Sequence, residues 1–286
     1  MGKKIVATTS TSCLDYYENN YDIRTIRIKL DIDGKLYADG SEMPADKFFK
    51  LLKENPTLIP KTTQVPIGEL LDFFEGLYKE GYDEVFVTTI SSKLSGSYNG
   101  ICQCAQILAD KMKIVVYDTK TVCFNEGIFA LRAAQLIEEG KELSEIIPEL
   151  DYLHKNNMIM FAVDNLSYLV KNGRLSGAAG FLGTVLKIKP LLEVLENGEI
   201  HSVQKIRTTK KALDAVSIAA KEYINGRDYF MYLVYTTDEN LGYLKEQIKL
   251  NCNVDNLLEV PGSPIVGCHV GPGALGVGIF LKRNKE

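Results

Sequence analysis

The chain has 286 residues, of which 45% are hydrophobic and 24% charged, values typical of a globular protein with a substantial core. Its formal net charge of -4 gives no electrostatic basis for binding nucleic acid, which needs a basic face. No run approaches the roughly 18 apolar residues of a membrane span, and the start MGKKIVATTS lacks the apolar region of a secretory signal. We expect a cytoplasmic protein that binds no nucleic acid.

The first half of the chain alternates short β-rich runs with amphipathic segments, which is the pattern of parallel β-α-β units. Strands are expected over residues 3–9, 26–32, 84–90 and 113–119, and helices over 66–81, 97–111 and 124–140. In the first of these helices Leu70, Phe74 and Leu77 recur at three- and four-residue spacing, which indicates one apolar face. We therefore expect a parallel sheet flanked by helices.

The second half begins with another expected strand, over residues 158–164, and then loses this regular alternation. Asn197-Gly198 between two β-rich runs predicts a hairpin, because both residues tolerate positive φ. Helices are expected over 209–224 and 239–250, a buried strand over 230–237 and final strands over 267–280. The fold class predicted is two α/β domains, residues 1–160 and 161–286, that share an interface.

The six cysteines are scattered along the chain and show no paired C-x-x-C spacing. Cys102 and Cys104 lie two residues apart on an expected helix, so their side chains point to different faces. Reduced, buried thiols are therefore the expected state, and we predict no metal site.

The run GPGALG, residues 271–276, satisfies the dinucleotide fingerprint G-x-G-x-x-G. That motif functions only where a helix and a second strand follow the glycines, and ten residues remain after Gly276. The match is therefore interpreted as accidental. The glycines must serve another purpose, with His269 lying between Gly267 and Gly271.

Three clusters of hydroxyl side chains lie close to expected strand ends, at residues 7–12, 61–66 and 91–98. Ligands of open α/β sheets bind beyond the carboxyl ends of the strands, so these clusters could meet at one edge and hold an anionic head group. Each cluster alone is more typical of helix N-capping than of a binding site.

His269 and Arg207 are the candidate partners of such an anion. The imidazole of His269 could donate to a bound oxygen, and Arg207 could supply charge at the end of the predicted hairpin. The alternatives are a structural histidine and a solvated arginine ahead of a helix. A serine hydrolase is the rival class, but the sequence contains no G-x-S-x-G elbow, and only His269 could act as its base.

The segments HVGPGALG, ISSKLSGSYNG and YLVKNGRLSGAAGFLGTVLKIKPLLEVLENGEI resemble the DegV family, and the likeness runs nearly the whole length of the chain. The resemblance implies two α/β domains with a long-chain fatty acid between them. It also implies that Thr62 and Ser95 hold the carboxylate and that His269 and Arg207 belong to the network beside it. Some members are the lipid-binding subunit of a bacterial fatty acid kinase.

The chain departs from the family pattern in two segments. The usual D-S-T-A-D reads TTSTS, so that Thr8 and Ser12 replace both aspartates. The usual T-S-Q-P-S reads TTQVP, which leaves Thr63 as an alternative to Thr62 as the carboxylate ligand. Candidates for the wall of the acyl tunnel are Phe181, Leu182, Val185, Leu186 and Ile188.

The expected function is binding of a palmitate-like acid (hexadecanoate) for lipid transport or metabolism, without catalysis and without a cofactor. The first alternative is a subunit that presents its fatty acid to a kinase partner, which makes the acyl phosphate. The second is a serine-dependent esterase or thioesterase that uses Ser95 and His269. A transient contact with a membrane would be compatible with the first two.

Overall fold

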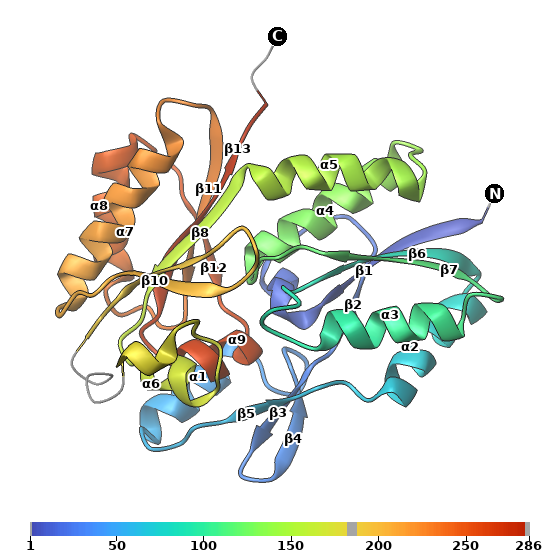
Figure 1. Ribbon diagram of the computed structural model, residues 1–286, viewed down its shortest axis with the longest axis horizontal. Coiled ribbons are helices and arrows are strands. Elements are labelled where there is room, and N and C mark those ends of the chain that lie inside the picture. Colours follow the sequence, from blue (N-terminus) through green and yellow to red (C-terminus); the bar gives the residue numbers. More distant parts are fainter. Residues whose placement is uncertain (1, 182–187, 284–286) are drawn as a thin grey trace.

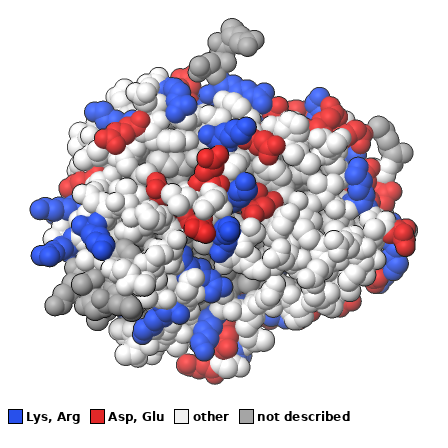
Figure 2. Space-filling view, in the orientation of Figure 1, with Lys and Arg blue, Asp and Glu red and all other residues white. Residues whose placement is uncertain are grey.

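The computed structural model describes residues 2–181 and 188–283, which form two lobes side by side (Figure 1). The described strands are arranged in three sheets of four, three and six strands. Among the described residues, no helix combines the length and apolar character needed to cross a membrane. On the face shown in Figure 2, Lys and Arg side chains are interspersed with Asp and Glu.

The four-stranded sheet of the first lobe is parallel throughout. Its order is β2 (Ile23–Ile26), β1 (Lys3–Thr9), β6 (Tyr82–Thr89) and β7 (Lys113–Asp118). Helices α2 (Ile67–Lys79) and α3 (Ser97–Ile107) cover one face, and α4 (Phe124–Glu138) and α5 (Leu143–Lys155) cover the other. Because side chains alternate along a strand, Ile5 and Ala7 pack toward α2 and α3, whereas Val6 packs toward α4 and α5.

A small antiparallel sheet, in the order β4 (Lys35–Ala38), β3 (Lys29–Ile32), β5 (Lys61–Thr63), lies below this layer with α1 (Ala45–Glu54). The single strand expected over 26–32 is wrong, because β2 ends at Ile26 and β3 begins in a different sheet. Between them the Ile28 N–H donates to Ser10 Oγ at 3.2 Å, and Arg27 pairs with Asp15. These tertiary contacts turn the chain out of the first sheet.

The second lobe contains a mixed six-stranded sheet. Its order is β10 (Ile200–Gln204), β9 (Leu191–Val194), β8 (Asn157–Ala162), β13 (Leu275–Leu281), β11 (Tyr229–Tyr235) and β12 (Leu258–Pro261). Helices α7 (Thr209–Ile224) and α8 (Leu241–Cys252) pack on the face that includes Leu275 and Val277. The opposite face, with Phe161 and Val234, packs toward the first lobe. The predicted fold class, two α/β lobes with a parallel sheet in the first, is confirmed.

The domain limits 1–160 and 161–286 stay a prediction, since β8 lies across residue 160 and pairs within the six-stranded sheet. The predicted hairpin is present as β9 and β10, although only Gly198 of the Asn-Gly pair takes positive φ, at 89°. A Cβ on Gly198 would lie 2.1 Å from Ser91 Oγ, which instead donates to the Gly198 carbonyl at 2.8 Å. The hairpin tip thus packs directly on the first lobe.

The glycine-rich segment 267–280 was expected to form strands, but only its second part does. Its first part belongs to α9 (Pro264–Val270), because Ser263 accepts from the Val266 N–H as N-cap and Pro264 occupies the first turn. Gly271 then ends the helix with φ at 73°, and β13 follows. The helix precedes these glycines, so the geometry of a dinucleotide loop is not formed.

Candidate functional site

A cavity of about 300 Å³ lies between the two lobes, within the size range of small-molecule sites. Its apolar wall is shared between the lobes and includes Ile90, Leu94, Ile159, Phe161, Ile200 and Val234. Three further wall residues, Ile265, Val266 and Val270, come from α9. The cavity is thus a largely apolar space whose sides belong to segments far apart in the sequence.

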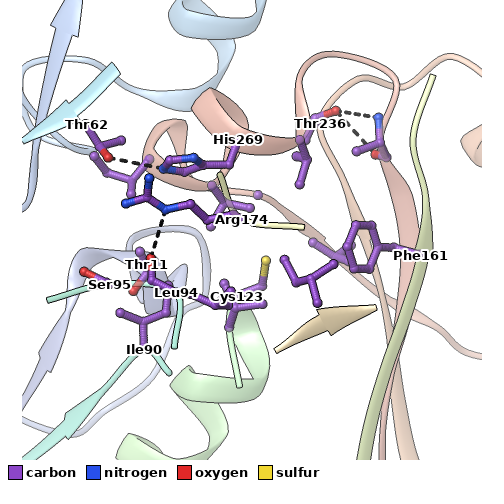
Figure 3. A pocket seen from close by; sticks show the side chains of 18 of the residues that line it. Thr11, Thr62, Ile90, Leu94, Ser95, Cys123, Phe161, Arg174, Thr236 and His269 are labelled. Carbon is purple, nitrogen blue, oxygen red and sulfur yellow. Dashed lines mark hydrogen bonds between the residues drawn. The ribbon is translucent and has the colours of Figure 1, made fainter. Parts of the chain in front are cut away.

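One end of the cavity is polar. Thr62 and Thr63 of β5, Ser95 ahead of α3 and His269 of α9 all line it. Thr62 Oγ1 lies 3.2 Å from Nε2 of His269, and Figure 3 shows both side chains beside Arg174. The structure therefore brings four of the five predicted ligand-binding residues to one cavity.

His269 is uncharged at neutral pH. Burial is the main cause that lowers its pKa to about 4, and the positive charge of Arg174 adds to the effect. Its Nδ1 is buried and has no hydrogen-bond partner among the described residues. A neutral imidazole in this position can orient a neighbouring hydroxyl without adding charge.

Arg174, which the sequence-based reasoning did not select, supplies the positive charge at this end. It follows the short helix α6 (Ser167–Lys171), and its Nε donates to the Leu94 carbonyl at 3.1 Å. Nη1 donates to the carbonyl of Asn172. Among the described residues no carboxylate forms an ion pair with Arg174. The sequence could have indicated Arg174 through the motif KNGRLSG, which belongs to one of the segments that resemble the DegV family.

Ser95 lies at the polar end and also supports the start of α3. Its Oγ accepts the Ser97 N–H at 3.2 Å and lies 2.9 Å from Ser97 Oγ. The imidazole of His269 contacts Thr62, not Ser95. A serine nucleophile requires a base within hydrogen-bonding reach, so the described contacts do not form the pair that an esterase needs.

The mouth of this polar end is formed by two exposed residues, Gln64 and Gly96. The side-chain Nε2 of Gln64 donates to the Gly96 carbonyl at 2.9 Å, which joins the loop after β5 to the loop before α3. The polar groups therefore lie just inside the molecular surface.

Arg207 is exposed, in the segment that joins β10 to α7, and is not among the described residues that line the cavity. Its role beside the head group stays a prediction. Of the residues proposed for the tunnel wall, Leu182, Val185 and Leu186 lie outside the described residues. Ile188 is buried but is likewise not among the described lining residues.

The first hydroxyl cluster binds a carboxyl group of the protein itself. Thr11, which lines the cavity, donates to Glu126 Oε2 at 2.6 Å, and Thr8 donates to Oε1 at 3.2 Å. The hydroxyl of Thr9 also donates to Oε1. Complete burial raises the pKa of Glu126 to about 8 despite these hydrogen bonds, so it is largely protonated at neutral pH. Glu126 was not anticipated from the sequence.

Among the described residues, no group of three or more His, Cys, Asp or Glu side chains could hold a metal ion. The polar end instead offers hydroxyls, a neutral imidazole and one guanidinium. Such a set suits an organic anion, whose charge would be unfavourable to bury without donors.

Comparison with known proteins assigns the family. A family model described as an uncharacterised protein of the DegV family matches residues 3–282. The chain belongs to the DegV family. A DegV domain-containing protein of Listeria innocua is 33% identical over 290 residues, with 99% of this chain and 100% of the relative covered. The family resemblance predicted from the sequence motifs is confirmed.

Solved DegV structures share the whole fold. A structure described as a fatty acid binding DegV family protein from Streptococcus agalactiae has a TM-score of 0.88 at 28% identity, covering 99% of this chain and 100% of its own. A structure described as DegV, a fatty acid binding protein from Bacillus subtilis, has a TM-score of 0.86 at 29% identity, covering 99% and 100%.

Proposed function

We propose that this DegV protein binds a long-chain fatty acid, with the carboxylate at the polar end of the cavity and the acyl chain between the lobes. The observation that carries the proposal is the guanidinium of Arg174, which lies beside Thr62 and His269 with no carboxylate partner among the described residues. The similar DegV structures described as fatty acid binding support it.

The carboxylate would accept hydrogen bonds from side chains of both lobes. If Nε2–H of His269 donates to Thr62 Oγ1, the hydroxyl proton of Thr62 is free to donate to the ligand. Arg174 supplies charge, and Ser95 a second hydroxyl. Charge-assisted hydrogen bonds of this kind offset the loss of carboxylate hydration.

The acyl chain supplies most of the affinity. Burial of ~14 methylenes at ~0.8 kcal/mol each contributes on the order of 11 kcal/mol before the ordering and association terms are subtracted. The wall that would receive it is apolar from Leu94 through Phe161 to Val234. We propose a palmitate-like chain for this space.

The role that fits this site is carriage or presentation of the acid inside the cell, for lipid transport or metabolism. The exposed mouth at Gln64 and Gly96 favours the presenting role, because a carboxylate oxygen there would be within reach of a separate kinase. A transient membrane contact would load the acid. The esterase alternative has no support from the pairing of His269 with Thr62.

The proposal is tested by mass spectrometry of organic extracts from the purified protein, followed by native mass spectrometry with added palmitate. We expect one long-chain acid per chain. Thr57, exposed in the turn after α1, provides a matched control: Thr57→Ala should bind as the unmodified protein does, whereas Thr62→Ala should bind more weakly. No acid in the extract and no complex with added palmitate would reject the function.

A further inference from the structure

Two cysteine thiols lie next to each other, and one of them, Cys123, is in the wall of the cavity. Cys13 follows the 3-10 turn Ser10–Ser12, and Cys123 precedes α4. Both are free, and their exposed fractions are 0% and 5%. Cys123 lines the cavity, and Figure 3 shows it between Leu94 and Phe161, beyond the polar end.

The backbone brings these two residues together. Gly127 in the first turn of α4 packs against the 3-10 turn so closely that a Cβ there would lie 2.6 Å from the Ser12 carbonyl. Cys13 and Cys123 both have positive φ, at 58° and 59°, where the chain bends on either side of this contact. The two thiols are within hydrogen-bonding reach of each other, and this contact together with burial raises the pKa of Cys13.

The other cysteines lack this combination. The buried thiols of Cys104 and Cys268 donate to backbone carbonyls, as that of Cys13 does to the Thr11 carbonyl. Unlike Cys13, neither has a second thiol as a hydrogen-bond partner among the described residues. Cys102 and Cys252 are partly exposed. Of the six, Cys123 alone is among the described residues that line the cavity, and Cys13 is the thiol beside it.

We propose that Cys13 and Cys123 form a peroxide-reactive dithiol, and that its oxidant is a fatty acid hydroperoxide held in the cavity. The inference rests on the proposed function, since the acyl chain delivers the peroxide. With the carboxylate beside Thr62 and His269, the middle of the chain lies against Cys123, so a hydroperoxide in mid-chain meets this sulfur.

The reaction needs no further reactant. Cys123 Sγ attacks the terminal oxygen of the hydroperoxide, the O–O bond breaks, and the thiol proton leaves with the hydroxy acid. Cys123 is then a sulfenic acid. Cys13 Sγ attacks the Cys123 sulfur, the S–O bond breaks, and water leaves as the disulfide forms. Two thiols lose two electrons, and one peroxide gains them.

The order of the two steps follows from the environments of the sulfurs. Cys123 opens on the cavity and meets the peroxide first. Cys13 has no exposed surface and a raised pKa, so its thiol reacts only once a sulfenic acid lies beside it. The disulfide would join the 3-10 turn to α4 and draw the Cys123 sulfur toward Cys13, away from the bound chain.

The experiment uses reduced, delipidated full-length protein in which Cys102→Ser and Cys252→Ser remove the partly exposed thiols. The protein receives one equivalent of linoleic acid hydroperoxide, of linoleic acid or of hydrogen peroxide, and free thiols are then blocked with N-ethylmaleimide. Peptide mapping locates the disulfide, and the hydroxy acid is quantified. We expect one Cys13–Cys123 bond per hydroxy acid formed, more rapidly with the lipid hydroperoxide than with hydrogen peroxide.

Three variants separate the steps. Cys123→Ser should abolish the reaction, and Cys13→Ser should leave a sulfenic acid on Cys123 that dimedone traps. Cys268→Ser, which changes a buried but solitary thiol, should leave the reaction unchanged. Palmitate binding is measured in the same samples. Binding without disulfide or hydroxy acid would overturn the dithiol proposal and leave the proposed function standing, whereas loss of both would overturn both.

Discussion

Thr62 Oγ1 and His269 Nε2 lie 3.2 Å apart although 207 residues separate them in the sequence. The contact joins β5 of the small sheet to α9, the helix that also contributes three residues to the apolar wall. A fatty acid carboxylate bound here would therefore contact both β5 and α9.

Replacement of Thr62 tests this contact. Thr62→Ala removes a charge-assisted hydrogen bond worth about 1.5 to 3 kcal/mol. Because roughly 1.4 kcal/mol corresponds to a tenfold change in affinity, palmitate affinity should fall by about one to two orders of magnitude. His269→Ala should produce a comparable loss, and the double variant should lose less than the sum, because the two side chains act together. Isothermal titration calorimetry measures all three. Fully additive losses would show that the residues act independently.

The two arginines can be distinguished directly. Arg174→Gln should weaken palmitate binding strongly, because the guanidinium is the only cationic group among the described lining residues. The imidazole of His269, with its pKa lowered to about 4, is uncharged. Arg207→Gln should leave the affinity unchanged, since Arg207 is exposed and outside the described lining. Fluorescent fatty acid displacement compares the two variants. The opposite ranking would place Arg207 in the network beside the carboxylate, as the family resemblance implies.

The depth of the acyl channel can be altered from β8. Ile159→Trp should fill part of the cavity, so that affinity for a long acid falls while a shorter acid is still bound. Ile218→Trp on α7, where the native side chain is 51% exposed, is the matched control and should bind both acids normally. A chain-length series measured by displacement checks this. Equal losses for short and long acids would indicate that Ile159 lies near the head group instead.

Two buried carboxyl groups predict how stability depends on pH. Burial raises the pKa of Asp39 from 3.8 to about 7 and that of Glu126 to about 8. In the unfolded chain both ionise near pH 4, whereas in the folded protein they stay protonated until higher pH. The unfolding free energy should therefore fall as pH rises from about 4 to 8, by up to about 1.4 kcal/mol per pH unit for each group.

The variants Asp39→Asn and Glu126→Gln should flatten this dependence, because neither amide titrates. Glu54→Gln, which changes an exposed residue near the end of α1, should not. Urea unfolding followed by circular dichroism at several pH values provides the measurement. If the unfolding free energy depends on pH as strongly when both substitutions are combined, other groups cause the dependence.

Much of the fold was predictable because local pattern and tertiary structure agree. The strand over 3–9 and the helix over 209–224 have the predicted limits, and Asn225, with φ at 44°, ends the helix. The prediction failed at 26–32, where the contacts of Ser10 and Asp15 divide the strand. It also failed at 267–270, where Ser263 and Pro264 start a helix ahead of the glycines.

The candidate site, like the fold, was predictable in part from the sequence. Thr62, Ser95 and His269 lie in recognisable motifs, so the sequence identified them, and the structure places all three at one cavity. Arg174 and Glu126 were missed because their significance depends on what surrounds them. A guanidinium that pairs with no carboxylate of the described residues and a carboxyl group enclosed by threonine hydroxyls arise only once distant segments have packed together.

The central claim is that a fatty acid carboxylate lies beside Arg174, Thr62 and His269, and carbon NMR of palmitate labelled at its carboxyl carbon tests it most directly. The account predicts one resonance for the bound acid, ionised to lower pH than in water, whose titration moves to higher pH in Arg174→Gln and is unchanged in Arg207→Gln. A bound resonance whose titration is identical in the unmodified protein and in Arg174→Gln would contradict it.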